Sequence, residues 1–193
     1  MQKILAKGAE ATITQTNNTI TKERTPKKYR HPELDKELIK TRTKTETKIM
    51  QKIPETAPKL IKTENNKITM EYIEGKLLKE IIDKQTKLSK NIGETTAKLH
   101  DKNIIHGDLT TSNIILDKNK KIRIIDYGLS QISTKEEDKA VDLHLFKEAI
   151  KSKHYKNEKK IWKKFLEGYN PKNKEKILQR LKKVETRGRN KGK

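Results

Sequence analysis

Two short stretches separated by a predicted hairpin constrain the fold of this chain more than any other feature. The first covers residues 106–113, with the sequence HGDLTTSN, and the second covers residues 126–128, with the sequence DYG. Two isoleucine-rich runs lie between them and flank a turn-forming segment at 117–121. This pattern predicts two short antiparallel strands, with Asn113 at the start of the first and Asp126 just after the second.

The hairpin brings oxygen-bearing side chains to one place, since Asp108 lies on the loop just before it. Asp and Asn supply the hard oxygen ligands that Mg²⁺ accepts when phosphate oxygens and water complete its shell. The spacing matches the protein-kinase catalytic loop H-R-D-x-x-x-x-N followed by D-F-G. We therefore expect Asn113 and Asp126 to hold the metal and Asp108 to orient an attacking hydroxyl or water. His106 is expected to hydrogen-bond within the loop, and Asp142 to bind the loop backbone.

Composition limits the classes of function. Of 193 residues, 31% are hydrophobic and 38% are charged, and the net charge is +21. A net charge this positive attracts polyanions, and nucleic acid is the first candidate. The alternative is a lysine-rich composition whose side chains are only solvated at the surface. The chain has no cysteine, which excludes disulfides and thiolate chemistry. No apolar stretch approaches the ~18 residues of a membrane span, so we expect no membrane contact and a cytoplasmic location.

The first part of the chain reads as strands around one long helix. Polar and apolar residues alternate over residues 1–30, as in short antiparallel strands. A helix is expected to begin at Pro32 and end before Pro54, and two strands to follow at 59–63 and 67–72. On that helix, the residues predicted to share one apolar face are Leu34, Leu38, Thr45 and Ile49.

From Gly75 onward the pattern is mainly helical, apart from the hairpin. Apolar residues recur at helical spacing in five segments: 77–82, 88–99, 141–150, 161–169 and 174–184. These elements predict an α+β, minimal two-lobed protein-kinase-like fold. Its expected parts are a small strand-rich N-lobe with one long helix (1–72), a reduced helical C-lobe (73–185) and a basic flexible tail (186–193).

A phosphoryl-transfer site also needs a loop over the phosphates and a lysine. The covering loop is expected between the first two strands, at Gly8, Ala9 and Glu10, where one glycine stands in place of the usual three. An ordinary hairpin turn is the alternative for that segment. For the lysine, Lys22 ends an alternating run, and Glu46 lies on the long helix where it can turn inward as its partner.

The adenine of ATP should lie against the segment that joins the two lobes. Backbone groups of Met70, Glu71 and Ile73 are expected to hydrogen-bond its edge, and Ile115 to form the floor beneath it. The cluster of Arg24, Lys27, Lys28 and Arg30 is expected at the entrance of the site, where it could also contact RNA.

Two departures from protein kinases narrow the function. His-Gly-Asp replaces His-Arg-Asp, so no arginine is available to bind a phosphorylated activation loop. The segment 127–141 is short and lacks the Ala-Pro-Glu anchor that helps to hold peptide substrates. Nucleotide chemistry is therefore retained, whereas a docking surface for protein substrates is largely absent. His-Gly-Asp also occurs in small-molecule phosphotransferases, so it does not decide between these classes alone.

Longer strings are more specific. Residues 28–35 (KYRHPELD), 42–46 (RTKTE) and 106–113 together closely resemble the small kinase-like ATPase subunit of the KEOPS complex, the PRPK-type family of archaea and eukaryotes. The resemblance runs from Gly8 to Arg189. It implies ATP and Mg²⁺ as cofactors, autophosphorylation on Ser or Thr, and ATP hydrolysis in support of N6-threonylcarbamoyladenosine at position 37 of tRNA.

The resemblance also implies partners. These are the threonylcarbamoyl-transferase subunit on the C-lobe face, a small KEOPS subunit on the N-lobe, and tRNA through the basic tail. Residues 170–193 contain ten Lys or Arg and two Glu, which suits contact with a phosphate backbone. Three other functions remain open: a stand-alone Ser/Thr protein kinase, a small-molecule phosphotransferase and a non-catalytic tRNA-binding module.

Overall fold

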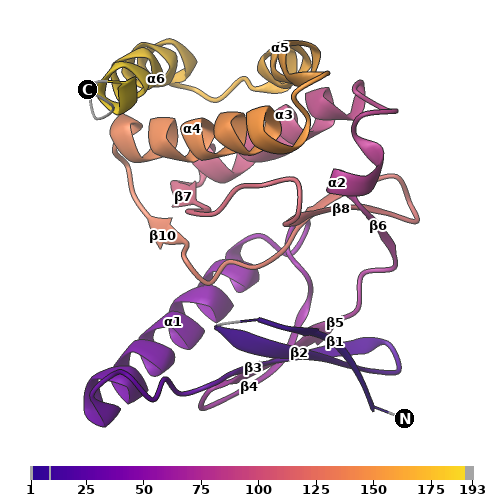
Figure 1. The fold of residues 1–193 in the computed structure, drawn as a ribbon, viewed down its shortest axis with the longest axis vertical. Helices are drawn as coiled ribbons and strands as arrows, with labels where there is room; N and C mark the ends of the chain where they lie inside the picture. The colour runs from indigo at the N-terminus through magenta and orange to yellow at the C-terminus, as the bar shows by residue number, and fades with distance from the viewer. Residues whose placement is uncertain (1, 9, 190–193) are drawn as a thin grey trace.

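A five-stranded antiparallel sheet forms the N-terminal part of the computed structural model, which describes residues 2–8 and 10–189 (Figure 1). The strands lie in the order β1-β2-β3-β5-β4. Their bounds are Gln2–Lys7 for β1, Ala11–Thr16 for β2, Thr19–Arg24 for β3, Leu60–Glu64 for β4 and Lys67–Glu71 for β5. Asparagines with positive φ, Asn17 and Asn65, begin two of the hairpin turns, because asparagine tolerates the left-handed conformation. The strands predicted before residue 30 and around the Asn65 turn are confirmed.

Helix α1 (Pro32–Lys52) runs beside this sheet (Figure 1). It begins with a proline, which lacks the N–H that the first helical turn leaves unpaired, and Glu33 and Asp35 complement its N-terminal dipole. Of the predicted apolar face, Ile49 is buried, but Leu34 is 54% exposed, so the prediction is wrong at the start of the helix. Residues 32–47 of α1 border a groove lined by basic and aliphatic side chains, and the buried residues in the second half of the helix are Thr43, Glu46, Thr47, Ile49 and Met50.

Two small sheets follow the N-terminal sheet, and one of them contains the catalytic hairpin. Strand β8 (Ile114–Asp117) pairs with β9 (Ile122–Ile124), which confirms the predicted hairpin, and β6 (Gly75–Leu77) adds to its other edge. Strands β7 (Ile104–Ile105) and β10 (Gln131–Ile132) form the second sheet. The sequence placed Leu77 in a helical segment, and this was wrong because the pairing of β6 with β8 depends on residues far along the chain.

Helices form the opposite end of the molecule (Figure 1). They are α2 (Leu78–Ile81), α3 (Leu88–Asp101), α4 (Glu136–Lys153), α5 (Glu158–Gly168) and α6 (Lys174–Arg189). A flexible tail from residue 186 was predicted, but residues 186–189 continue α6, and only 190–193 lie outside the described residues. Glu137 of α4 explains the difference, since it pairs with both Arg180 and Arg187 of α6.

One hydrophobic core joins the two ends. Buried Ile49 and Ile68 from the N-terminal part belong to the same cluster as Ile114 and Phe146 from the C-terminal part. The position of α1 is therefore fixed relative to the catalytic hairpin. Within the described residues, no helix combines the length and apolar character of a membrane span.

Helices α3 and α5 approach closely at a glycine. A methyl group on Gly93 would clash with the carbonyl oxygen of Phe165 and lie 2.7 Å from the amide nitrogen of Tyr169. We expect Gly93→Ala to lower the free energy of unfolding by about 1–3 kcal/mol, because overpacking outweighs the better helix propensity of alanine. Urea unfolding measures this. Asn91→Ala, at an exposed position of the same helix, is the control, and equal stabilities of the two variants would contradict the packing argument.

Candidate active site

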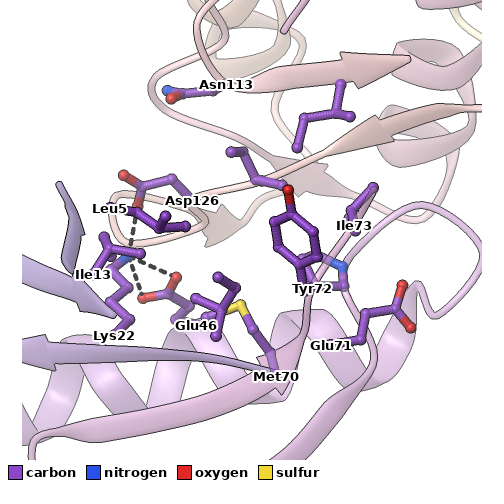
Figure 2. Close-up of a pocket in the computed structure, with 14 residues that line it drawn as sticks. Leu5, Ile13, Lys22, Glu46, Met70, Glu71, Tyr72, Ile73, Asn113 and Asp126 are labelled. Carbon is purple, nitrogen blue, oxygen red and sulfur yellow. Dashed lines mark hydrogen bonds and ion pairs between the residues drawn. The ribbon is translucent and has the colours of Figure 1, made fainter. Parts of the chain in front are cut away.

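Three elements meet at the ammonium of Lys22. This buried side chain on β3 lies 2.8 Å from Glu46 of α1 and 2.7 Å from Asp126, which follows β9 (Figure 2). Glu46 is 1% exposed, whereas the Asp126 side chain is about half-exposed. The structure therefore contains the predicted pair of Lys22 and Glu46 and adds Asp126 to it. A buried charge of this kind persists only because it is paired.

Arg24 is a second cation on the same carboxylate. It lies two residues beyond Lys22 on β3, on the same face of the strand, and its guanidinium pairs with Glu46. The sequence analysis placed Arg24 at the entrance of the site, but the side chain is only 4% exposed. Its Nε has no hydrogen-bond partner among the described residues. Arg24 lies two residues after Lys22, and residues at this spacing on a strand point to the same face. This spacing was the signal that could have assigned Arg24 to the interior.

The backbone at Asp126 supports this arrangement. Asp126 has φ of 65°, a left-handed conformation that costs a non-glycine residue energy and that often marks functional sites. Burial raises the pKa of Asp126, but the charge and hydrogen bond of Lys22 outweigh that effect and hold it below the ordinary value. Gly128 leaves room for these groups, because an added methyl would lie 3.0 Å from the Arg24 guanidinium.

Asp108 and Asn113 are linked directly. The Asn113 side-chain amide donates to the backbone carbonyl of Asp108 at 2.9 Å and to its carboxylate at 2.8 Å. Because the amide nitrogen is used in this way, the amide oxygen remains as the group that can bind a metal. No cluster of three His, Cys, Asp or Glu in the described part of the chain could hold a metal ion by itself. The oxygens of Asn113 and Asp126 fit Mg²⁺ that takes its other ligands from phosphates and water.

The catalytic loop is held by Asp142 of α4, as predicted. The Asp142 carboxylate accepts hydrogen bonds from the backbone N–H groups of His106 at 2.8 Å and Gly107 at 2.9 Å. The His106 ring contacts Ile125 O at 3.1 Å and accepts from the N–H of Asp108, which confirms its expected hydrogen bonding within the loop. Both contacts position Asp108 without making His106 a base.

Sequence analysis missed two supports of that loop. His100 bridges Asp142 at 3.2 Å and the hydroxyl of Tyr169 at 2.7 Å. His154 contacts the Thr111 hydroxyl at 3.0 Å and the carboxylate of Asp83 at 2.7 Å. Both histidines lie far along the chain from their partners, so no local spacing could reveal these contacts.

An apolar cavity adjoins the charged cluster (Figure 2). The predicted residues Met70, Glu71, Ile73 and Ile115 all line it. The N–H of Glu71 already donates to Lys59 O, whereas no described backbone carbonyl accepts the N–H of Ile73. Sequence analysis missed further apolar lining residues, among them Ile13, Ile20 and Ile125. Strand alternation placed Ile13 and Ile20 on strands but did not show which face turns to the cavity.

A second cavity contains Lys22, Asp108 and Asp126 together with the predicted covering loop. Gly8 donates its N–H to Ala11 O at 3.0 Å, so the loop between β1 and β2 is a tight turn, and Ala9 lies outside the described residues. Glu10 pairs with Arg42 of α1 at 2.8 Å. The covering loop is thus connected to the helix that also carries Glu46.

Comparison with known proteins assigns the family. The RIO-domain family model matches residues 3–152, which include every predicted site residue. The chain belongs to the RIO-domain family. Among solved structures, the Rio2 kinase of Chaetomium thermophilum, in a complex with ADP/Mg²⁺-phosphoaspartate, superposes with a TM-score of 0.62 at 14% identity. The superposition covers 96% of this chain and 70% of the Rio2 chain. It confirms the predicted kinase-like α+β fold.

Closer relatives place this RIO domain among Bud32 proteins. The KEOPS subunit BUD32 of Encephalitozoon cuniculi is 42% identical, with 94% of this chain and 93% of the relative covered. The KEOPS subunit Bud32 of Pyrococcus abyssi is 37% identical, with 97% and 96% covered. A probable bifunctional tRNA threonylcarbamoyladenosine biosynthesis protein of Methanocaldococcus jannaschii is 41% identical, but this chain spans only 37% of its length.

The shared carboxylate predicts an asymmetry in stability. Glu46→Gln leaves Lys22 and Arg24 without their common buried partner, so we expect it to cost about 3–5 kcal/mol of unfolding free energy. Lys22→Met should cost clearly less, because Arg24 still pairs with Glu46. Urea unfolding of both variants tests this, and equal losses would mean that Arg24 does not compensate.

Asp142 predicts a pH dependence. Burial raises its pKa, but the His100 hydrogen bond and the other contacts outweigh this and hold the pKa below the ordinary 3.8. A depressed carboxyl pKa stabilises the fold above the ordinary value, and this stabilisation is lost as the pH falls through the folded-state pKa. Asp142→Asn should therefore lower Tm at pH 7 and flatten the fall of Tm below about pH 4. Exposed Glu94→Gln is the control, and an unchanged acid slope in Asp142→Asn would refute the assignment.

Proposed function

We propose that this chain is the ATP- and Mg²⁺-dependent kinase-like ATPase subunit of a KEOPS-type complex, which supports threonylcarbamoyladenosine formation at position 37 of tRNA. The observation that carries the proposal is the cluster of Lys22, Glu46 and Asp126 beside the linked Asp108 and Asn113. The names of the Encephalitozoon and Pyrococcus relatives, which align over nearly their whole length, support the setting.

In this proposal, residues 1–72 cover the nucleotide and residues 73–185 supply the catalytic loop. Adenine enters the apolar cavity beside Ile115, and the N–H of Ile73, which has no backbone acceptor among the described residues, donates to its edge. Lys22 turns from Asp126 toward the α- and β-phosphates, while Glu46 orients its ammonium. Gly8 and Glu10 bring the covering loop over the phosphates.

Chemistry takes place between the loop and the hairpin. Asp108 accepts a hydrogen bond from the attacking water, or from a Ser or Thr hydroxyl in autophosphorylation, and so aligns it with the phosphoryl group. Asn113 and Asp126 hold Mg²⁺, which neutralises phosphate charge when bound. The hydrogen bonds from Asn113 to Asp108 fix the metal ligand and the orienting carboxylate relative to each other.

The proposed partners are those that the family resemblance implies. The threonylcarbamoyl-transferase subunit would bind the C-lobe face, and a small KEOPS subunit would bind the N-lobe. In the cytoplasm, tRNA would contact the basic C-terminal segment, which α6 now presents as a helix through Arg189. Several lysines of α6, including Lys176, Lys182 and Lys183, are exposed and can neutralise backbone phosphates.

ATP hydrolysis tests the proposal. We expect turnover by the purified protein to rise strongly when the transferase subunit and tRNA are added. Asp126→Ala should reduce it by roughly 10²–10³-fold, because a group that stabilises transferred charge is lost. Chelation of Mg²⁺ should have a similar effect. Thermal melts of the variant show whether the fold is intact.

Two results would count against the proposal. Equal hydrolysis by wild type and Asp126→Ala would show that the site does not perform the reaction. Hydrolysis unchanged by the partner, together with efficient phosphorylation of added proteins, would favour a stand-alone Ser/Thr protein kinase.

A further inference from the structure

A large groove lies on a different face of α1 from Glu46. Its walls are the loop 26–30, one face of α1 over residues 32–47, and the turn between β4 and β5. It encloses about 970 Å³, which is far more than a single bound ion requires. None of the residues assigned to ATP or Mg²⁺ lines it, so its composition calls for a separate explanation.

The groove is strongly basic. Six cationic side chains line it, namely Lys27, Lys28, Arg30, Lys36, Lys40 and Lys44, against one acid, Asp35. Asp35 is only 3% exposed and is already occupied by the Lys27 backbone N–H and the Arg30 guanidinium. The ion pairs at the groove are those of Arg30 with Glu10 and Asp35, and none of the five lysines lies within 4 Å of a carboxylate of the described residues.

The arrangement suits a phosphate backbone better than an acidic protein. Lys36, Lys40 and Lys44 follow one another at about 6 Å along one helix face, close to the separation of successive phosphates in an extended strand. Tyr29, between two lining residues, is 77% exposed, and the Arg30 guanidinium lies 5.4 Å from its ring. An exposed ring beside a basic groove is a platform on which a base can stack.

We propose that this groove binds the phosphate backbone of an RNA strand, with a base stacked on Tyr29. In the setting of the proposed function, on which this identification of the RNA rests, the strand belongs to tRNA. The contact lies on the N-terminal part of the molecule and is separate from the basic helix α6 (Figure 1).

A charge-matched pair of variants tests the groove. We expect joint replacement of Lys36, Lys40 and Lys44 by Gln to weaken binding of a tRNA transcript at least tenfold. The slope of log affinity against log salt should become shallower by about 2–3, as three phosphate contacts are lost. The control replaces Lys159, Lys160 and Lys163 on exposed positions of α5 by Gln, with the same change in net charge. Fluorescence anisotropy measures both, and thermal melts verify folding.

Tyr29→Ala tests whether the groove binds nucleic acid through stacking or binds any polyanion through charge. We expect it to weaken RNA binding about fivefold or more, because stacking is lost, and to leave polyglutamate binding unchanged. Equal losses of RNA affinity in the groove and control variants would overturn the proposal. The groove lysines would then contribute only to the overall surface charge. Polyglutamate that displaces RNA as effectively as unlabelled RNA would overturn it in favour of an acidic protein.

These results are independent of the ATPase test. The groove variant should hydrolyse ATP without the partner or RNA at the wild-type rate, since its lysines lie outside the nucleotide cavities. If the groove variant loses RNA while wild type hydrolyses no ATP, the groove stands and the proposed function fails. If wild type hydrolyses ATP but both triple variants bind RNA equally, the groove fails and the proposed function stands.

Discussion

The carboxylate of Glu46 is the point on which the site depends. It is buried on α1 and receives both Lys22 and Arg24 from one strand, so it fixes the helix against the sheet. Lys22 in turn reaches Asp126 at the end of the hairpin, which connects the sheet with the catalytic loop. In a protein kinase, one lysine both binds the ATP phosphates and pairs with the glutamate of the helix. Here Arg24 can retain the helix while Lys22 is engaged elsewhere.

The catalytic loop is rigid for a similar reason. Asp142 takes two of its backbone N–H groups, and His100 and Tyr169 fix Asp142 from behind. Because Asp142, His100 and Tyr169 are hydrogen-bonded in series behind the loop, the loop is held in one conformation, and its partly buried Asp108 carboxylate needs little reorganisation on binding substrate. The strained backbone at Asp126 is tolerated within this frame.

Local sequence signals predicted much of this molecule. The hairpin from Ile114 to Ile124, the ends of α1 at Pro32 and before Pro54, and the pairing of Lys22 with Glu46 all follow from periodicity, turn residues and motif spacing. The errors have a common cause. Strand β6, the exposure of Leu34 and the continuation of α6 depend on contacts between distant segments, which residue patterns do not encode. Arg24 was misplaced because charge alone suggested exposure.

The ion pair between Glu10 and Arg42 has a consequence for rates. Its side chains are 53% and 30% exposed, so water and salt screen the attraction, which is worth about 0.2–1 kcal/mol. A restraint of this size shifts the balance between closed and open covering loop only a few-fold. When this pair breaks, the backbone hydrogen bond from Thr25 N–H to Glu10 O still holds the loop. In the proposed function, the ion pair would therefore slow exchange of spent for fresh nucleotide only slightly, and by less as ionic strength rises.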